Sequence, residues 1–383
     1  MARPGAARRG RIAATAVLVV VGGLAIPTGG AVAATIGQAA GGTAISADEF
    51  GTSSYSSRTG PVIGESGAGE LALGSTTVLN MPSGFRMSPS AGTISIGGAG
   101  CDLKGTLSVT STQATFTVTH ASTVAGCIVL FVGLAVQPTA GPGLVSGNIT
   151  KTGTSAAPGG ATNYGTLTKV AGAVAQLVYL TQPSSTNFGG IAFGTQPAVL
   201  ARDQFGNPKA NAPVTLSITK GTGATGAKLT CATNPIRTDG AGVANFTGDA
   251  CRINLAASYR LRAASGAKAV NSGTFTVAVG PATRIAFKAY PATPTKATLA
   301  AQPRAAIVDA GGNIVTTYPP TRITLAISMH ASTFKCTSGL TVTTVKGVAQ
   351  FKGCRQTVLG NGYRLTAWTG FAFTTGKVFK VVR

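Results

Sequence analysis

Two ten-residue stretches, AVLARDQFGN at 198–207 and RAAIVDAGGN at 304–313, place an aspartate and an asparagine at matching points of the chain. The match continues downstream, at offsets between 103 and 109, in the pairs TLSI (215–218) and TLAI (324–327), KLTC (228–231) and TFKC (333–336), GVANF (242–246) and GVAQF (347–351), Cys251 and Cys354, and YRLRA (259–263) and YRLTA (363–367). Such self-similarity indicates two copies of one fold, at 172–280 and 281–383, that differ by short loop insertions.

Each copy is predicted to be all-β. In the first copy, short apolar runs bounded by turn residues predict strands near 176–180, 198–203, 213–218, 227–231, 242–246, 258–263 and 273–278. Seven short strands in a unit of this size are typical of an immunoglobulin-like sandwich. The composition agrees: only 10% of the 383 residues are charged, whereas 53 are Gly and 19 are Pro, and helical surfaces usually carry more charge.

The matched Asp and Asn residues are expected at structural turns. Asp203 with Asn207, and Asp309 with Asn313, follow a predicted strand in each copy, where Asx side chains bond their own backbone and stabilise a reversal. A calcium site is the alternative, but no further spaced carboxylates accompany either aspartate.

Aromatic residues mark the late strands of both copies. Tyr259 and Tyr363 each open such a strand and are predicted tyrosine-corner residues, whose hydroxyl ties the strand to the preceding connection; ligand stacking is the alternative. Trp368, Phe371 and Phe373 cluster with Tyr363, and alternate aromatics of this kind are expected in the core rather than on a binding face.

The ordered motifs DxxGN, a VTLxI-type strand, LxC, TxxGxAxF, a second Cys and YxLxA together resemble the bacterial immunoglobulin-like domains of surface proteins, of the Big-1 and invasin-like kind. The resemblance covers about 172–383. Such domains usually act as extracellular spacers or adhesive modules, so the resemblance implies a structural or adhesive role, and it assigns no catalytic residue.

The chain before the repeats is predicted to hold a further β-sandwich-like module at 61–171. Strand-length runs support it at 76–85, 92–96, 105–110, 114–120, 127–136 and 147–156. Residues 34–60, rich in Gly, Ser, Thr and Ala, are expected to form a flexible lead-in. The whole chain is thus predicted to be a series of tandem β-sandwiches.

The first 33 residues have the order of a secretory signal peptide. A basic stretch (2–11) precedes an apolar one (12–26), and small residues at Ala31 and Ala33 favour cleavage after Ala33. An uncleaved anchor is the alternative, but the apolar run is shorter than the roughly 20 residues that a span needs. We therefore expect a secreted protein, free or noncovalently associated with the cell envelope, with no transmembrane anchor after cleavage.

Six cysteines fall two to each proposed module, and an even count in an exported chain indicates disulfides. Correspondence between the repeats selects two pairs and leaves the third: Cys231 with Cys251, Cys336 with Cys354, and Cys101 with Cys127. Metal binding would need clustered Cys or nearby His, which the sequence lacks.

No enzymatic chemistry is expected. The chain has only two histidines, His120 and His330, and nine carboxylates, too few and too scattered for a nucleophile with its base, a glycosidase carboxylate pair or a hydrolytic metal site. His120 is expected to be a strand-end or partly buried residue rather than a base. Neither a cofactor nor a metal is predicted.

The basic charge points to anionic partners. The formal net charge is +22, and +18 remains after four arginines leave with the leader. Such a body is drawn to anionic cell-envelope polymers or glycans, although basic residues that merely keep the surface soluble are the simpler explanation. No motif indicates a specific nucleic acid. The sequence therefore favours a structural or adhesive surface protein, with a secreted carbohydrate- or polyanion-binding protein as the alternative.

Overall fold

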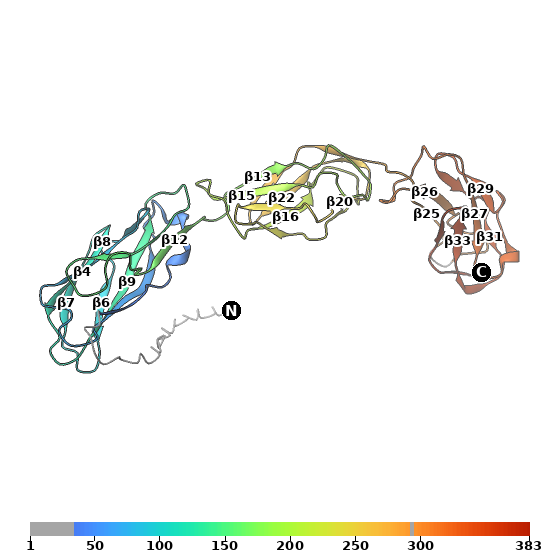
Figure 1. The fold of residues 1–383 in the computed structure, drawn as a ribbon. Helices are drawn as coiled ribbons and strands as arrows, with labels where there is room; N and C mark the ends of the chain where they lie inside the picture. The colour runs from blue at the N-terminus through green and yellow to red at the C-terminus, as the bar shows by residue number, and fades with distance from the viewer. Residues whose placement is uncertain (1–33, 292–294) are drawn as a thin grey trace, which may run out of the picture.

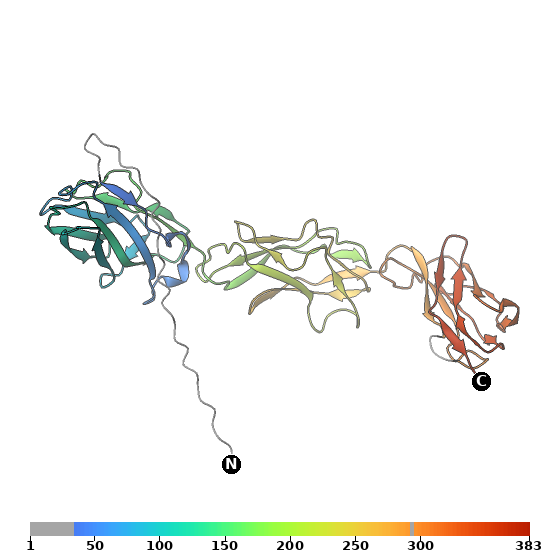
Figure 2. The ribbon, with the colours of Figure 1, turned by 90° about the horizontal axis from the view of Figure 1, so that it is seen from below.

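Three β-sandwich modules follow one another in an extended row (Figures 1 and 2). This computed structural model describes residues 34–291 and 295–383, so the predicted signal peptide at 1–33 lies outside the described residues. We refer to the N-terminal module (34–171), the middle module (172–280) and the C-terminal module (281–383). Each has its own apolar core. In the part of the chain that the structure describes, no helix has the length and apolar character to cross a membrane.

The N-terminal module is built on two facing sheets, β1-β3-β9-β5, with β6 also on β9, and β11-β4-β8-β7, beside the small sheet β10-β12-β2. Its elements are β1 (Thr35–Gly37), η1 (Gly42–Ala44), β2 (Ile45–Ser46), η2 (Ala47–Glu49), β3 (Ser56–Gly64), β4 (Thr76–Asn80), β5 (Phe85–Met87), β6 (Thr93–Gly97), β7 (Lys104–Val109), β8 (Gln113–His120), β9 (Ile128–Pro138), β10 (Ser146–Asn148), β11 (Thr150–Thr152) and β12 (Thr166–Val170). Alternate residues of β8 point inward, and the Phe116 ring meets Phe131 of β9 edge-on, with centroids 6.4 Å apart.

The expected flexible lead-in at 34–60 is wrong. Strand β1 pairs with β3, β2 pairs with β12, and Ile45 and Ala47 are fully buried. The expected boundary at 61 falls inside β3. A composition of small residues is typical of a linker, but the buried Ile45 lies opposite Lys169 of β12, more than 100 residues later in the chain, and no local pattern can indicate such a pairing.

The middle module has the main sheets β13-β15-β19, β14-β24-β21 and β18-β16-β22-β23, with the ribbon β17-β20. Its strands are β13 (Gln176–Thr181), β14 (Thr186–Phe188), β15 (Ala198–Arg202), β16 (Pro213–Ile218), β17 (Leu229–Thr230), β18 (Ile236–Arg237), β19 (Val243–Asn245), β20 (Arg252–Ile253), β21 (Ala257–Tyr259), β22 (Leu261–Ser265), β23 (Lys268–Asn271) and β24 (Phe275–Ala278).

The C-terminal module repeats this plan in the sheets β25-β26-β30 and β29-β27-β33-β34, with the pairs β28-β31 and β32-β35. Its elements are β25 (Arg284–Ala289), β26 (Arg304–Val308), β27 (Arg322–Ile327), η3 (Ala331–Thr333), β28 (Phe334–Lys335), β29 (Thr341–Thr343), β30 (Val348–Gln350), β31 (Arg355–Gln356), β32 (Gly360–Tyr363), β33 (Leu365–Trp368), β34 (Phe373–Thr375) and β35 (Phe379–Val381). The shift in register within the first strand pair also recurs, after Tyr179 in the pair β13–β15 and after Phe287 in the pair β25–β26.

One disulfide crosslinks each module, as predicted. The bonds are Cys101–Cys127, Cys231–Cys251 and Cys336–Cys354. The second cysteine of each pair is fully buried in its module's core.

Candidate functional site

The predicted turn at Asp203 and Asn207 lies where the middle module meets the N-terminal module. Asp203 is buried, and its Oδ1 accepts hydrogen bonds from the backbone N–H groups of Phe205 and Asn207, both at 2.9 Å. Its Oδ2 accepts the N–H of Gly172, at 3.0 Å, in the connecting segment between β12 and β13 (171–175), and the side-chain amide of Asn207. The same amide donates to the carbonyl of Gly141 in the N-terminal module, at 3.0 Å. The turn therefore binds the preceding module as well as itself.

These hydrogen bonds keep the aspartate ionised. Burial alone would raise the pKa of the Asp203 carboxyl, but the hydrogen bonds donated by Asn207, Gly172 and Phe205 outweigh it, so the pKa lies below its usual value. The charged form is the one that accepts all of these N–H donors at neutral pH.

The second copy of the turn forms the second joint in the same way. Asp309 is fully buried, and its Oδ1 accepts the N–H of Asn313 at 2.8 Å. Its Oδ2 accepts the N–H of Gly280, at 2.9 Å, in the connecting segment between β24 and β25 (279–283). The Asn313 side chain donates to the carbonyl of Asn254, at 2.8 Å, and accepts the N–H of Ala256, at 2.9 Å. Both of those partners belong to the middle module.

Each Asp–Asn clasp, the pair Asp203 with Asn207 or Asp309 with Asn313, thus has two parts. The aspartate accepts hydrogen bonds from the turn and from the connecting segment, and the asparagine side chain hydrogen-bonds the backbone of the preceding module. Across residues 34–291 and 295–383, no three His, Cys, Asp or Glu side chains gather as they would to hold a metal ion.

The two joints are filled differently, because Gly311 stands where the first copy has Phe205. At the first joint the Phe205 ring packs edge-on against Phe50 of the N-terminal module, with centroids 6.0 Å apart, and a Cβ on Gly141 would collide with that ring. At the second joint the backbone of Gly311 approaches the carbonyl of Asn254 so closely that any Cβ would overlap it. One joint is closed by aromatic packing and the other by direct backbone approach.

Two charged residues at the first joint were not predicted from the sequence. Asp48 accepts the N–H of Ala173, at 2.7 Å, and the side-chain amide of Gln204, at 3.0 Å. Buried Lys169 donates through Nζ to the carbonyls of residues 140–142. Burial lowers the pKa of Lys169, while nearby Asp203 acts in the opposite direction. No local motif surrounds either residue, so only the folded contacts identify them.

The predicted corner tyrosines are fully buried and bonded to the connection before them. The Tyr259 hydroxyl donates to the carbonyl of Leu255 at 2.7 Å, and the Tyr363 hydroxyl to that of Val358 at 2.9 Å. The N-terminal module has a counterpart that was not predicted from the sequence, in which the Tyr164 hydroxyl donates to the carbonyl of Pro158, six residues earlier. Each module thus holds one buried tyrosine tied to its own chain.

Replacing Tyr363 by Phe is expected to lower the free energy of unfolding of the C-terminal module by about 0.5–1.5 kcal/mol, the usual net contribution of one hydrogen bond. Trp368 is the only tryptophan of the chain, so its fluorescence in a urea titration reports on this module. Tyr259→Phe is the matched control and should leave the Trp368 transition in place. An unchanged midpoint for Tyr363→Phe would refute the tyrosine-corner prediction.

The expected core placement of the aromatic residues near the end of the chain is correct for only one of the four. Tyr363 is buried, but Trp368, Phe371 and Phe373 are exposed, by 39%, 54% and 75%. They lie on and beside the hairpin of β33 and β34, where the inward positions are taken by Leu365 and smaller residues. Alternation alone does not reveal which face of a strand is the core face.

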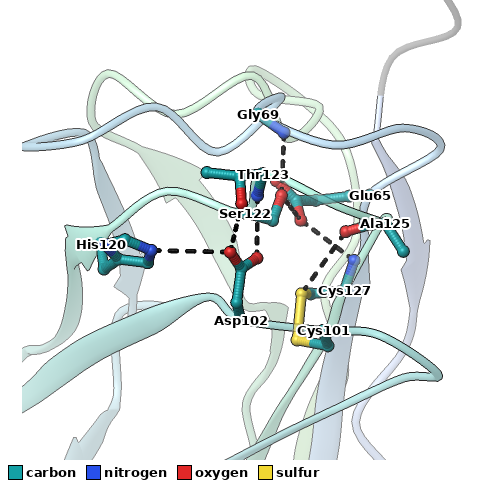
Figure 3. A network of polar contacts seen from close by, with 9 residues as sticks. All are labelled: Glu65, Gly69, Cys101, Asp102, His120, Ser122, Thr123, Ala125 and Cys127. Atoms are coloured by element: carbon teal, nitrogen blue, oxygen red, sulfur yellow. Dashed lines mark hydrogen bonds and ion pairs between the residues drawn. A yellow bond between two sulfur atoms is a disulfide. The ribbon is translucent and has the colours of Figure 1, made fainter.

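The far end of the N-terminal module carries a polar network around its disulfide (Figure 3). Asp102 accepts hydrogen bonds from the backbone and the hydroxyl of Thr123, and its Oδ2 lies 3.6 Å from His120 Nε2. The Thr123 side chain, followed by its backbone N–H, holds the pKa of Asp102 below its usual value. His120 ends β8, as expected, and its side chain is half exposed.

Glu65 orders the neighbouring loop in the same network. Its two oxygens accept the N–H groups of Leu71 and Cys127 and the hydroxyl of Ser122. Loop donors, most of them drawn in Figure 3, thereby engage the carboxylates of Glu65 and Asp102, and the arrangement accounts for the order of the loops beside the disulfide.

Comparison with known proteins adds similarity of fold only. No family model and no curated protein matches the chain. Among solved structures, the Escherichia coli adhesin FdeC is 15% identical, over 82% of this chain and 94% of its own, with a TM-score of 0.30. The Yersinia pseudotuberculosis adhesin InvE is 14% identical, over 69% of this chain and 68% of its own, with a TM-score of 0.25.

Other matches belong to different functional classes. Domains 5–6 of the S-layer protein SbsC are 19% identical, over 54% of this chain and 99% of that chain, with a TM-score of 0.19. A β-glycosidase from Bacteroides vulgatus is 11% identical, over 54% of this chain and 24% of its own, with a TM-score of 0.24. Likeness at this level says nothing about the activity or partners of the chain.

Proposed function

We propose that the chain is an exported, non-enzymatic structural and adhesive surface protein, whose repeated modules hold a binding end at a distance. The observation that supports this most strongly is the recurrence of the Asp–Asn clasp. Asn207 and Asn313 each bond the preceding module, and Asp203 and Asp309 each fix the segment that enters their own module. A joint built twice from the same residues restrains the row of modules, which is what a spacer requires.

The crosslinks fit an extracellular setting. Each module is small and holds few large aromatic side chains, and each has one disulfide within it. Disulfides form and persist in oxidising compartments, where small domains use them to supplement a limited core. Secretion and association with the envelope are therefore part of this proposal.

A second candidate function, polyanion binding, is favoured by an uneven distribution of charge. The N-terminal module has five basic and five acidic residues, the middle module nine and three, and the C-terminal module thirteen and one. The net charge thus rises from zero to +6 to +12 along the row. Most of the basic side chains of the two repeats are exposed, so the C-terminal end presents a positive field to its surroundings.

Retention of the mature chain on isolated cell envelopes tests this proposal. We expect strong retention at low salt that falls steeply towards physiological salt, because exposed charges are screened with a Debye length of about 8 Å at 0.15 M. A neutral monosaccharide should not displace the protein. Absence of retention at low salt would contradict an adhesive role, and retention that is unchanged in high salt would contradict an electrostatic one.

A further inference from the structure

The outer face of the sheet β29-β27-β33-β34 in the C-terminal module carries an unusual row of side chains. Residues directly opposite one another in antiparallel strands point to the same face. Thr341 pairs with Thr324, Thr324 with Trp368, and Trp368 with Phe373, so these four form one continuous row. The two threonine hydroxyls lie 2.9 Å apart, and the two aromatic residues are exposed.

The neighbouring rows are mostly polar, with Ala326 opposite Thr366 as the exception. On one side, Arg322 pairs with Thr343, and both are exposed. On the other side, Thr366 pairs with Thr375. At the tip of the hairpin the exposed Phe371 packs on the ring of Tyr318, with centroids 6.0 Å apart. The face therefore combines aromatic rings, hydroxyl groups and a guanidinium.

The middle module shows that the fold does not need these aromatic residues. Its equivalent row is Thr215, Ala264 and Ala269, paired in the same register. Two alanines thus occupy the positions of Trp368 and Phe373. Soluble proteins carry few exposed aromatic residues beyond those that function requires, and large exposed apolar groups mark interaction sites.

The charge of the module indicates the sign of the partner. It has thirteen basic residues and a single acidic residue, Asp309, which is fully buried in the clasp. No acidic side chain of this module is therefore exposed to repel an anion. Arg322 lies on the aromatic face itself.

We propose that this outer face binds an anionic polysaccharide. The C–H bonds on one face of a sugar ring would pack on Trp368 and Phe373, whose ring faces carry partial negative charge. Arg322 would pair with the carboxylate or phosphate groups of the polymer, and the threonines would bond its hydroxyls. This proposal deepens the adhesive role proposed above and rests on it.

Binding of polyuronate (alginate) to the mature chain tests the proposal, measured by calorimetry at low salt with dextran and polyphosphate as comparison polymers. We expect alginate to bind at least about tenfold more tightly than dextran, which lacks charge, and than polyphosphate, which lacks sugar rings. The double variant Trp368→Ala/Phe373→Ala should lose about tenfold in alginate affinity, because it removes both stacking surfaces.

Two control variants keep the result interpretable. Arg262→Gln removes one exposed charge from the middle module and should change alginate affinity much less than Arg322→Gln. Building Ala264→Trp/Ala269→Phe into the double variant should restore part of the affinity, since the register of the two rows is the same. Circular dichroism of each variant confirms that it is folded.

The proposal would be overturned by unchanged alginate affinity in the folded double variant, by equal binding of polyphosphate and alginate, or by a dimer of the chain that the double variant dissociates. The last would assign the face to a second copy of the chain. If alginate fails to bind while isolated envelopes still retain the chain in a salt-dependent manner, the binding face is refuted and the proposed function stands. If neither binds, the adhesive role fails as well.

Discussion

Replacing Asp309 by Ala is expected to lower the free energy of unfolding of the C-terminal module by about 3–5 kcal/mol, because each buried donor that is left without an acceptor costs about 1–3 kcal/mol. The fully buried carboxylate accepts the N–H of Gly280 and both the backbone and the side-chain N–H groups of Asn313. Alanine would leave these donors without an acceptor. The change should appear as a lower midpoint in urea unfolding followed by Trp368 fluorescence.

The matching substitution in the other repeat is the control. Asp203→Ala removes the same kind of acceptor from the first clasp. It should leave the midpoint of the Trp368 transition unchanged, because Trp368 lies in the C-terminal module and Asp203 lies at the far end of the middle module. Lys220→Ala, an exposed substitution, should change neither module by more than about 0.5 kcal/mol. If Asp309→Ala left the midpoint of the Trp368 transition unchanged, the clasp would not contribute to the stability of the module.

Removing the disulfide of the C-terminal module, by Cys336→Ala with Cys354→Ala, is expected to cost about 3 kcal/mol. In the chain-entropy model, crosslinks that close loops of this size restrict the unfolded chain by that amount. The bond spans 18 residues, and one of its cysteines is fully buried. Trp368 fluorescence in a urea titration again measures the effect.

The corresponding double substitution of Cys231 and Cys251 tests whether the crosslinks act locally. It should destabilise the middle module and leave the Trp368 transition unchanged. If removal of either disulfide lowered both transitions by the same amount, the modules would unfold as one unit, and the description of the chain as separate sandwiches would need revision.

Much of the fold was predictable because it rests on local patterns. The range 213–218 was expected to be a strand, and β16 has those bounds, with Val214 and Leu216 pointing into the core. The disulfides followed from the correspondence between repeats. These features depend on residues close in sequence or on the comparison of two copies, and both are visible without a structure.

The joints were not predictable for the opposite reason. The turn chemistry of Asp309 and Asn313 is local, but the bonds that Asn313 makes with Asn254 and Ala256 join residues 59 and 57 positions apart. The binding face was missed because alternation gives a strand two faces without saying which is the core. Leu365 and Ala367 fill the interior, and Trp368 is left outside.

Small-angle X-ray scattering of the mature chain measures the extended arrangement of the modules directly. A compact globule of this length would have a radius of gyration of about 20 Å. Three sandwiches in a row held by two Asp–Asn clasps should give a clearly larger value and a pair-distance distribution with a long tail, at low and at physiological salt alike. A radius of gyration near 20 Å, with a symmetric distribution, would show that the modules fold back on one another and would contradict a spacer.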